Sequence, residues 1–233
     1  MTTPDTNAMA DVNGYGRELT PQEIDRKAHR HFVGGLWDEL GKLQFDFLVG
    51  RGLKPAHKLL DIGCGCLRGG LYYIDNLDTG NYYGLDINSS LIQAGLAEVR
   101  NARLEDKYPT LLVDDNFRLE RFSEAFDFMV SVSLFTHLPA NIIVRCLVEA
   151  KKYLKPGGVY FSTFFQAPHS AYLGRLTQLP INITTNYDSD PFHYSFEELS
   201  HMADVAELEA ELIGEWNHPR NQKMIAFSRK ESV

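Results

Sequence analysis

Cysteine is scarce in this chain: only three of its 233 residues are cysteine. Two of them, Cys64 and Cys66, stand one residue apart in a glycine-rich stretch. This number and spacing provide neither an even set of disulfide partners nor the paired spacing of a zinc site. The scarcity therefore predicts a reduced chain in a cytoplasmic compartment.

Basic residues are also in deficit. Lys and Arg number 23 against 31 Asp and Glu, which gives a formal net charge of -8. Proteins that hold phosphate backbones normally gather Lys and Arg on one face. This balance argues against a nucleic acid partner.

Long apolar runs are absent as well. No hydrophobic stretch approaches the roughly 20 residues that cross a bilayer, because charges or turn residues interrupt each one. Residues 1–16 are polar and contain no basic region followed by an apolar stretch, as a secretory signal requires. We expect neither export nor a membrane-bound protein.

What remains is the composition of an ordinary globular protein, with 44% hydrophobic and 23% charged residues. Residues 1–18 have the composition of a disordered tail, and residues 19–52 show helical spacing with a break at Gly34 and Gly35. We expect a helical cap there and a main domain over 53–233. Within that domain, the aromatic, loop-like segment 167–194 is predicted to be an insertion that faces the substrate.

After residue 53, short apolar runs alternate with segments of helical period, the pattern of βα units. The expected strands are 58–62, 81–85, 111–113, 126–132, 158–164, 208–215 and 223–229. The expected helices are 68–77, 89–100, 140–154 and 195–202. The alternation predicts an α/β fold with a doubly wound, mostly parallel, seven-stranded sheet and right-handed crossovers.

The most informative motif is residues 59–65, LLDIGCG, in which a buried strand runs directly into glycines. Glycine lets the backbone pass close to a ligand where a Cβ would collide, so a nucleotide-like cofactor is indicated. The NAD fingerprint also requires a glycine at position 68, where this chain has Arg68. Asp61, two residues before the first glycine, suits a ligand with an ammonium group.

Together with later segments, this motif resembles the class I, Rossmann-like S-adenosylmethionine-dependent methyltransferases of the small-molecule type. The resemblance covers about residues 55–165 and departs from the family pattern at Leu67, where many members have another glycine. It rests on four ordered blocks and a following turn: 61–65 (DIGCG), 83–87 (YGLDI), 113–117 (VDDNF), 126–138 (FDFMVSVSLFTHL) and 154–158 (LKPGG).

The resemblance implies S-adenosyl-L-methionine as cofactor and suggests how the chain would bind it. Asp86, at a strand end, would accept hydrogen bonds from the ribose hydroxyls. An acidic side chain, either Asp114 or Asp115, would lie near the adenine amino group. The cofactor-binding residues implied in full are Asp61, Gly63, Cys64, Gly65, Asp86, Ile87, Asp114, Asp115, Phe117 and Ser133.

Methyl transfer to a hydroxyl requires alignment, exclusion of water and a base that removes the acceptor's proton. His137 is the first candidate, because it follows a strand end beside the expected cofactor site and imidazole titrates near neutral pH. His193 and His218 are the other candidates, in the half expected to face the substrate. No metal is predicted, because no third carboxylate or Asn completes an oxygen shell with Asp114 and Asp115.

We therefore predict an enzyme that methylates a small-molecule acceptor, by O-methylation of a metabolite or sugar hydroxyl, as a monomer or homodimer. The alternatives are an S-adenosylmethionine-binding protein without transfer activity and a nicotinamide-dependent oxidoreductase. Local alternatives are open too. Asp86 also suits a helix cap, His137 a structural role, and Arg220 either an acidic substrate group or a surface carboxylate. The Gly-Gly break would suit a mobile lid or a plain packing helix.

Overall fold

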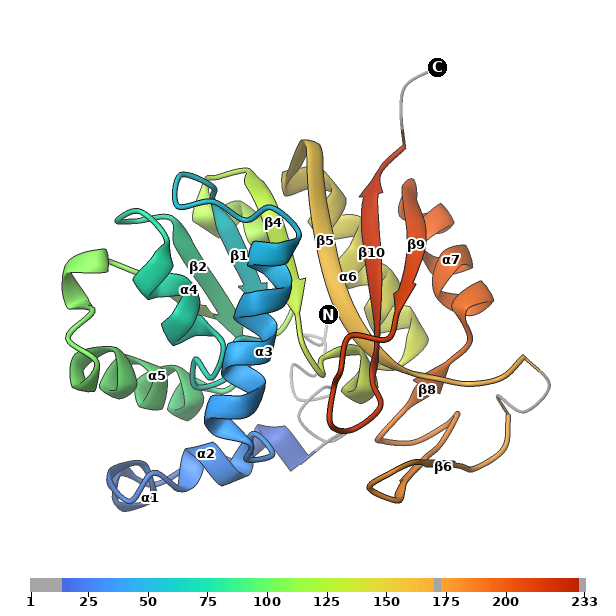
Figure 1. Ribbon diagram of the computed structural model, residues 1–233, viewed down its shortest axis with the longest axis horizontal. Helices are drawn as coiled ribbons and strands as arrows, with labels where there is room; N and C mark the ends of the chain where they lie inside the picture. Colours follow the sequence, from blue (N-terminus) through green and yellow to red (C-terminus); the bar gives the residue numbers. More distant parts are fainter. Residues whose placement is uncertain (1–13, 170–172, 231–233) are drawn as a thin grey trace, which may run out of the picture.

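The computed structural model describes residues 14–169 and 173–230 and shows a central twisted sheet between two layers of helices (Figure 1). The strand order is β3-β2-β1-β4-β5-β10-β9, and β8 pairs with the end of β5 as an eighth strand. The strands of this sheet are β1 (Leu59–Ile62), β2 (Tyr82–Asp86), β3 (Thr110–Val113), β4 (Phe126–Ser131), β5 (Leu154–Gln166), β8 (His193–Tyr194), β9 (Leu208–Gly214) and β10 (Lys223–Arg229). The strands β1 to β5 are parallel, and β10 runs antiparallel to both β5 and β9.

Within the described ranges the chain has seven α-helices, which pack on the sheet or against neighbouring helices. They are α1 (Pro21–Asp25), α2 (Ala28–Phe32), α3 (Trp37–Gly50), α4 (Gly70–Asn76), α5 (Ser89–Asn101), α6 (Ala140–Tyr153) and α7 (Phe196–Val205). Within these ranges none combines the length and the hydropathy that crossing a membrane demands.

Alternation along the strands divides the core between the two faces of the sheet. In β1, Leu59 packs with residues of α3, α4 and α5, whereas Leu60 and Ile62 pack with residues of α6 and α7. Successive side chains of a strand point to opposite faces, so a strand buried on both sides reads as one continuous apolar run. Helices on both faces of the sheet thus bury β1 at all four positions, three of them apolar and the fourth Asp61.

Side-chain caps set several helix starts. Asn88 precedes α5 and accepts hydrogen bonds from the backbone N–H groups of Ser90 and Leu91 at 2.9 and 3.2 Å. Ser195 and Glu198 form a capping box at the start of α7. Such caps satisfy N–H groups that the first helical turn leaves without partners.

The fold class predicted from the sequence, α/β with a doubly wound, mostly parallel sheet, is confirmed, and β8 adds an eighth strand to the seven expected. Three details differ. The N-terminal region contains three helices, because the chain also breaks at Lys27, which has a left-handed backbone. The fifth strand begins at Leu154, four residues earlier than predicted. The segment 167–194 was expected to be a loop, but it contains β8 and a hairpin of β6 (Leu176–Gln178) and β7 (Ile183–Thr185).

The predicted tail is wrong for residues 14–18, while residues 1–13 lie outside the described ranges. The carbonyls of Tyr15 and Arg17 accept hydrogen bonds from Asn88 Nδ2 at 2.7 and 2.8 Å. Glu18 accepts a hydrogen bond from the backbone N–H of Ser90. Polar composition suggested disorder, but these contacts fasten the segment to the start of α5.

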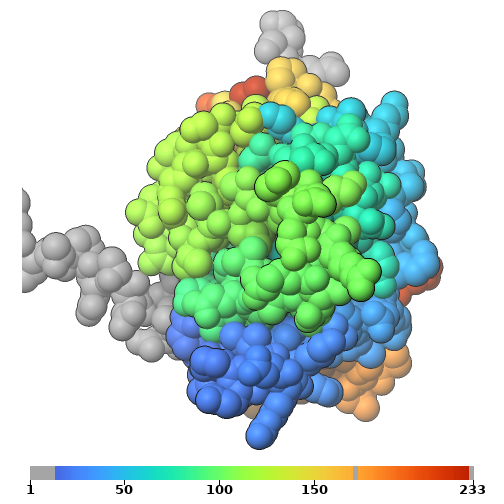
Figure 2. Space-filling view, turned by 90° about the vertical axis from the view of Figure 1, so that its left-hand side faces the viewer, coloured from blue at the N-terminus to red at the C-terminus, as the bar shows by residue number. Residues whose placement is uncertain are grey.

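A buried charge cluster attaches the N-terminal helices to the same helix. Glu98 of α5 is 3% exposed, accepts two hydrogen bonds from the Arg30 guanidinium at 2.8 Å and contacts His29 Nε2 at 2.8 Å. Figure 2 shows the N-terminal helices (blue) directly against the neighbouring green part of the chain. The N-terminal region is thus packed onto the sheet domain beside the strand ends.

Candidate active site

A cavity of about 310 Å³ opens where the carboxyl ends of β1, β2 and β4 meet the N-terminal segment. In parallel α/β sheets, ligands bind at this edge because strand ends and helix starts place polar groups there. Nine of the ten cofactor contacts predicted from the sequence line the cavity: Asp61, Gly63, Cys64, Gly65, Asp86, Ile87, Asp114, Phe117 and Ser133. Asp115 does not line it.

The loop after β1 has a shape that only glycine adopts easily. Gly63 and Gly65 have φ angles of +75° and +53°, in the left-handed region. A Cβ on Gly63 would also meet Leu134 Cδ1 at 3.0 Å. The backbone N–H groups of Gly63 and Cys64 donate to Leu85 O, which ties the loop to β2. The loop therefore forms a smooth wall that a ligand can approach closely.

Asp86 lies at the end of β2 with both carboxylate oxygens facing backbone donors. Oδ2 accepts from the Gly65 N–H at 2.8 Å and Oδ1 from the Asn88 N–H at 2.9 Å. Burial raises the pKa of Asp86, and hydrogen bonds from Asn88, Gly65 and Ile87 oppose this. A carboxylate has about four acceptor sites. Asp86 thus retains acceptor capacity for a ligand's donors, such as ribose hydroxyls.

Asp61 is a buried carboxyl group in the same wall. Burial raises its pKa to about 7, an effect that the hydrogen bond from Tyr82 Oη at 2.9 Å and the nearby Arg68 partly offset. A buried acid of this kind regains its charge when a cation binds next to it. Its setting is suited to an ammonium group.

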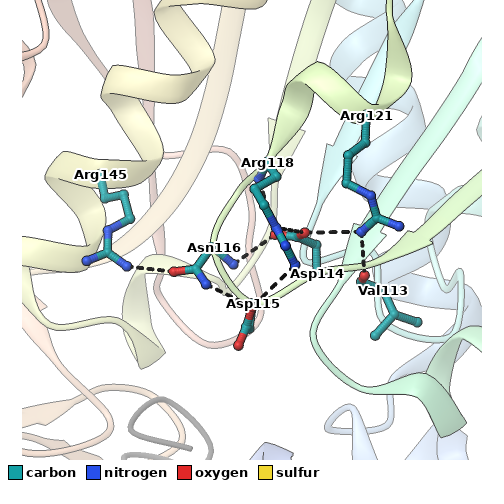
Figure 3. Close-up of polar contacts among 7 residues, drawn as sticks. All are labelled: Val113, Asp114, Asp115, Asn116, Arg118, Arg121 and Arg145. Carbon is teal, nitrogen blue, oxygen red and sulfur yellow. Dashed lines mark hydrogen bonds and ion pairs between the residues drawn. The ribbon is translucent and has the colours of Figure 1, made fainter. Parts of the chain in front are cut away.

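The loop after β3 holds Asp114 in a network of donors (Figure 3). Its Oδ1 accepts from the backbone N–H groups of Asn116 and Arg118 at 2.8 and 3.1 Å, and its Oδ2 from Arg118 Nε and Arg121 Nη1 at 2.6 and 3.1 Å. Burial raises the pKa of Asp114, but these hydrogen bonds outweigh burial and leave the pKa below its ordinary value. Asp114 is therefore a fixed, ionised carboxylate at the cavity wall.

Asp115 points away from this wall, with 36% of its side chain exposed. It accepts a hydrogen bond from Asn116 Nδ2, and Asn116 Oδ1 in turn accepts one from Arg145 (Figure 3). Phe117, next in the chain, is 5% exposed and lines the cavity. Of the two acids that sequence left open, the structure thus brings Asp114 to the cavity, beside an aromatic ring.

Of the three candidate histidines, the structure brings His137 to the cavity. Its Nδ1 is in hydrogen-bond contact with Asp190 Oδ1, from the segment that precedes β8. The ring of Tyr15 lies edge-on to the imidazole, with 4.7 Å between centroids. His193 does not line the cavity: it is fully buried, and its Nδ1 lies 2.9 Å from Thr185 Oγ1.

His218 lies outside the cavity wall and stacks on Trp216 with 5.2 Å between ring centroids. Its Nδ1 accepts a hydrogen bond from the backbone N–H of Arg220 at 3.2 Å. Burial, with the charges of Arg68 and Arg220, lowers its pKa to about 3. Such a histidine is neutral at physiological pH and a weak proton acceptor, so its environment does not favour the predicted role as base.

Three residues of the site escaped sequence reasoning. Tyr15 was assigned to the predicted tail. Arg68 was noted in the sequence only because the NAD fingerprint requires glycine at that position. Arg68 is 9% exposed, lines the cavity and donates from Nη1 to the carbonyls of Val33 and Gly35, both at 3.0 Å. Asp190 stands 53 residues after its partner His137. No local pattern connects residues so far apart, although an unexplained arginine in a ligand loop was a usable signal.

Comparison with known proteins agrees with this geometry. Residues 60–160 match the family model described as a methyltransferase domain. An S-adenosylmethionine-dependent methyltransferase from Clostridium acetobutylicum superposes with a TM-score of 0.65 at 10% identity, covering 90% of this chain and 99% of that one. Magnesium protoporphyrin IX methyltransferase (ChlM) from Synechocystis gives 0.60 at 13% identity, covering 99% and 100%. At such identities the likeness establishes the fold.

Curated relatives match over part of their length. A 24-methylenesterol C-methyltransferase 2 from Oryza sativa is 34% identical over 110 residues, which are 47% of this chain and 29% of that protein. A ubiquinone biosynthesis O-methyltransferase from Hahella chejuensis is 26% identical over 136 residues, which are 57% and 53%. The chain thus spans less than two thirds of the length of either relative.

The glycine loop after β1, the carboxylate at the end of β2 and the family match all fall within one segment of the sheet domain. They agree with the resemblance seen in the sequence. Residues 60–160 of the chain therefore match a methyltransferase domain, and the chain has the fold of the S-adenosylmethionine-dependent methyltransferases that it resembles.

Proposed function

We propose that this chain is a cytoplasmic S-adenosylmethionine-dependent methyltransferase that methylates a hydroxyl group of a small molecule, with His137 as general base. We extend the proposal to a monomer or homodimer without a nucleic acid partner. The observation that carries it is the His137–Asp190 pair at the cavity that the glycine loop and Asp86 also line. The two curated relatives are named for a sterol substrate and for ubiquinone biosynthesis, which supports a small-molecule acceptor.

The residues of the cavity fit the cofactor. Asp86 would hold the ribose, Phe117 and the Asp114 loop the adenine, and Asp61 the ammonium group. When bound, S-adenosylmethionine supplies a methyl group that passes in line to the acceptor oxygen, while the electron pair of the broken C–S bond stays on sulfur. The close wall formed by Gly63 and the buried acid at position 61 support this assignment.

His137 would take the proton that the hydroxyl loses as its oxygen bonds to carbon. With a proton on Nδ1 donated to Asp190, the tautomer presents Nε2 as proton acceptor. The Asp190 carboxylate holds the ring in place and stabilises the imidazolium that forms. Tyr15, packed against the ring, covers this part of the cavity and helps to exclude water.

The test combines binding and turnover. Calorimetric titration with S-adenosylhomocysteine measures cofactor binding, and labelled methyl donor with a panel of hydroxylated metabolites measures transfer. His137→Gln should keep the dissociation constant of S-adenosylhomocysteine within about twofold and slow transfer by about 10²- to 10⁴-fold. Asp190→Asn should slow transfer less strongly. His201→Gln, at an exposed position on α7, is the matched control and should change neither.

For each part of the proposal, a different experimental outcome would contradict it. Full turnover in His137→Gln would place the base elsewhere. Label on carbon or nitrogen instead of oxygen would contradict O-methylation. Binding of S-adenosylhomocysteine without label on any acceptor would favour a binding protein, and tight binding of NAD alone would favour the oxidoreductase alternative.

A further inference from the structure

A positively charged corner lies beside the cavity, next to Arg68 of the cavity wall. Arg220 and His218 come from the loop between β9 and β10, residues 215–222. The positive charge of Arg220 helps to lower the pKa of Arg68, and the charge of Arg68 helps to lower the pKa of His218. Arg68 and Arg220 contact carbonyls of the same short segment, residues 33–35, and the Arg220 backbone N–H donates to His218. The three side chains therefore stand close together where Arg68 forms the cavity wall.

The two arginines of this corner contact carbonyl groups. Arg220 Nη2 donates to Gly34 O, and Arg68 Nη1 donates to the carbonyls on either side of that residue. Over residues 14–169 and 173–230, no carboxylate forms an ion pair with either guanidinium. Within these ranges, carbonyl contacts leave Arg220 without a carboxylate in an ion pair, whereas Arg68 has the buried acid Asp61 within electrostatic reach. A half-buried cation without a counter-charge favours an anionic ligand.

The corner also contains buried donors without acceptors. His218 Nδ1 accepts the Arg220 N–H, so the proton of this neutral ring is on Nε2. His218 is 6% exposed and Arg68 is 9% exposed, and neither His218 Nε2 nor Arg68 Nε has a hydrogen-bond partner among the described residues. Buried donors are nearly always satisfied in folded proteins. The unpartnered His218 Nε2–H beside the Arg220 guanidinium, together with the unpartnered Nε–H of the Arg68 guanidinium, provides donors for a ligand's oxygen atoms.

Tyr15 relates this corner to the proposed base. Burial and then Asp190 raise the pKa of Tyr15, whereas Arg220 and Arg68 lower it. Tyr15 therefore lies within electrostatic reach of both the His137–Asp190 pair and the arginines. Tyr15, His137 and Arg68 all line the cavity, so an acceptor with its hydroxyl at His137 would approach the corner past Tyr15, at the side where Arg68 forms the wall.

We propose that Arg220 and His218 bind a carboxylate group of the acceptor, which makes the substrate a hydroxycarboxylic acid. The planar guanidinium matches both oxygens of a carboxylate, and the His218 N–H supplies a further donor. Arg68, on the cavity wall near Asp61, would face the cofactor's own carboxylate. The inference rests on the methyltransferase function proposed above and adds the charge of the acceptor to it.

The test uses the full chain saturated with S-adenosylhomocysteine and needs no turnover. A panel of hydroxycarboxylic acids, aliphatic and aromatic, is compared with the matching primary amides. Binding is detected as a rise in Tm and measured by calorimetry. At least one acid should bind more tightly than its amide, and R220Q should weaken that acid roughly 10- to 100-fold while leaving S-adenosylhomocysteine unchanged.

Two further variants keep the test interpretable. R220K retains the positive charge but lacks the planar guanidinium that contacts both carboxylate oxygens. It should therefore bind the acid with intermediate affinity, even if R220Q loses stability. R26Q alters an exposed arginine at the end of α1 and should behave as the unchanged protein does.

Two results would overturn the inference alone. The first is that no acid in the panel binds better than its amide. The second is that R220Q weakens S-adenosylhomocysteine but spares 5′-methylthioadenosine, which lacks the amino acid group, because the corner would then serve the cofactor. Failure of the unchanged protein to bind S-adenosylhomocysteine would instead overturn the proposed function, and this inference with it.

Discussion

Replacement of Asp86 by Asn tests the cofactor site most directly. Both oxygens of Asp86 accept backbone hydrogen bonds, from Gly65 at 2.8 Å and Asn88 at 2.9 Å, and the residue lines the cavity where ribose hydroxyls would bind. The amide has the shape of the carboxylate but one acceptor oxygen and no charge. The variant therefore changes the chemistry of the site with little change in its volume.

The magnitude follows from the number of bonds. A hydrogen bond to a charged group contributes about 1.5–3 kcal/mol and a neutral one about 0.5–1.5 kcal/mol. Two ribose bonds that lose their charged acceptor should together cost about 2–3 kcal/mol, roughly 30- to 150-fold in Kd. The amide also leaves either the Gly65 or the Asn88 N–H without an acceptor, which should lower the free energy of unfolding by about 1–2 kcal/mol.

Calorimetric titration with S-adenosylhomocysteine measures the first quantity and urea denaturation the second. Asp75→Asn, at an exposed position of α4, removes the same charge away from the cavity and is the control. A Kd within threefold of the unchanged protein, in a folded Asp86→Asn variant, would refute the ribose assignment. It would leave Asp86 the role of a loop anchor.

Two further predictions concern buried acids. Burial raises the pKa of Asp61 from 3.8 to about 7. The contribution of protonated Asp61 to the free energy of unfolding is therefore complete below about pH 3.8 and is lost as pH rises through 7. Asp61→Asn stays neutral and should therefore gain about 2 kcal/mol in free energy of unfolding, relative to the unchanged protein, between pH 5 and pH 8; a pH-independent difference in urea denaturation contradicts this. Glu98→Gln should lower the free energy of unfolding by about 2 kcal/mol, because it removes the buried charge that His29 and Arg30 share. Glu105→Gln, exposed, is the control, and equal stability of the two variants would count against a structural role for Glu98.

The fold follows from local information. Residues 59–65 combine an apolar run with glycines, and the next βα units repeat the alternation, so each local preference agrees with the same sheet. The errors fall where contacts between distant residues decide. Residues 14–18 have a polar composition, yet hydrogen bonds to Asn88 and Ser90 fasten them across more than 70 residues of sequence.

The cofactor site is also largely local, because its groups follow successive strands whose ends meet at one edge of the sheet. Sequence alone therefore placed Gly63, Gly65 and Asp86 in one candidate site. It left open whether Asp114 or Asp115 faces the ligand, since neighbouring residues in a loop differ only in direction. The turn that binds Asp114 to Arg118 and Arg121 brings Asp114 to the cavity.

The acceptor side depends on tertiary structure throughout. Sequence put His137 first among three candidate histidines because of its place after a strand. The fold alone paired it with Asp190 at the cavity and buried His218 next to two arginines. Charge, burial and direction at such positions come from segments far apart in sequence. The sequence by itself thus determined the sheet, and its first half indicated the class of the candidate cofactor site. Only the tertiary structure decided which groups meet where an acceptor would bind, because those groups are far apart in sequence.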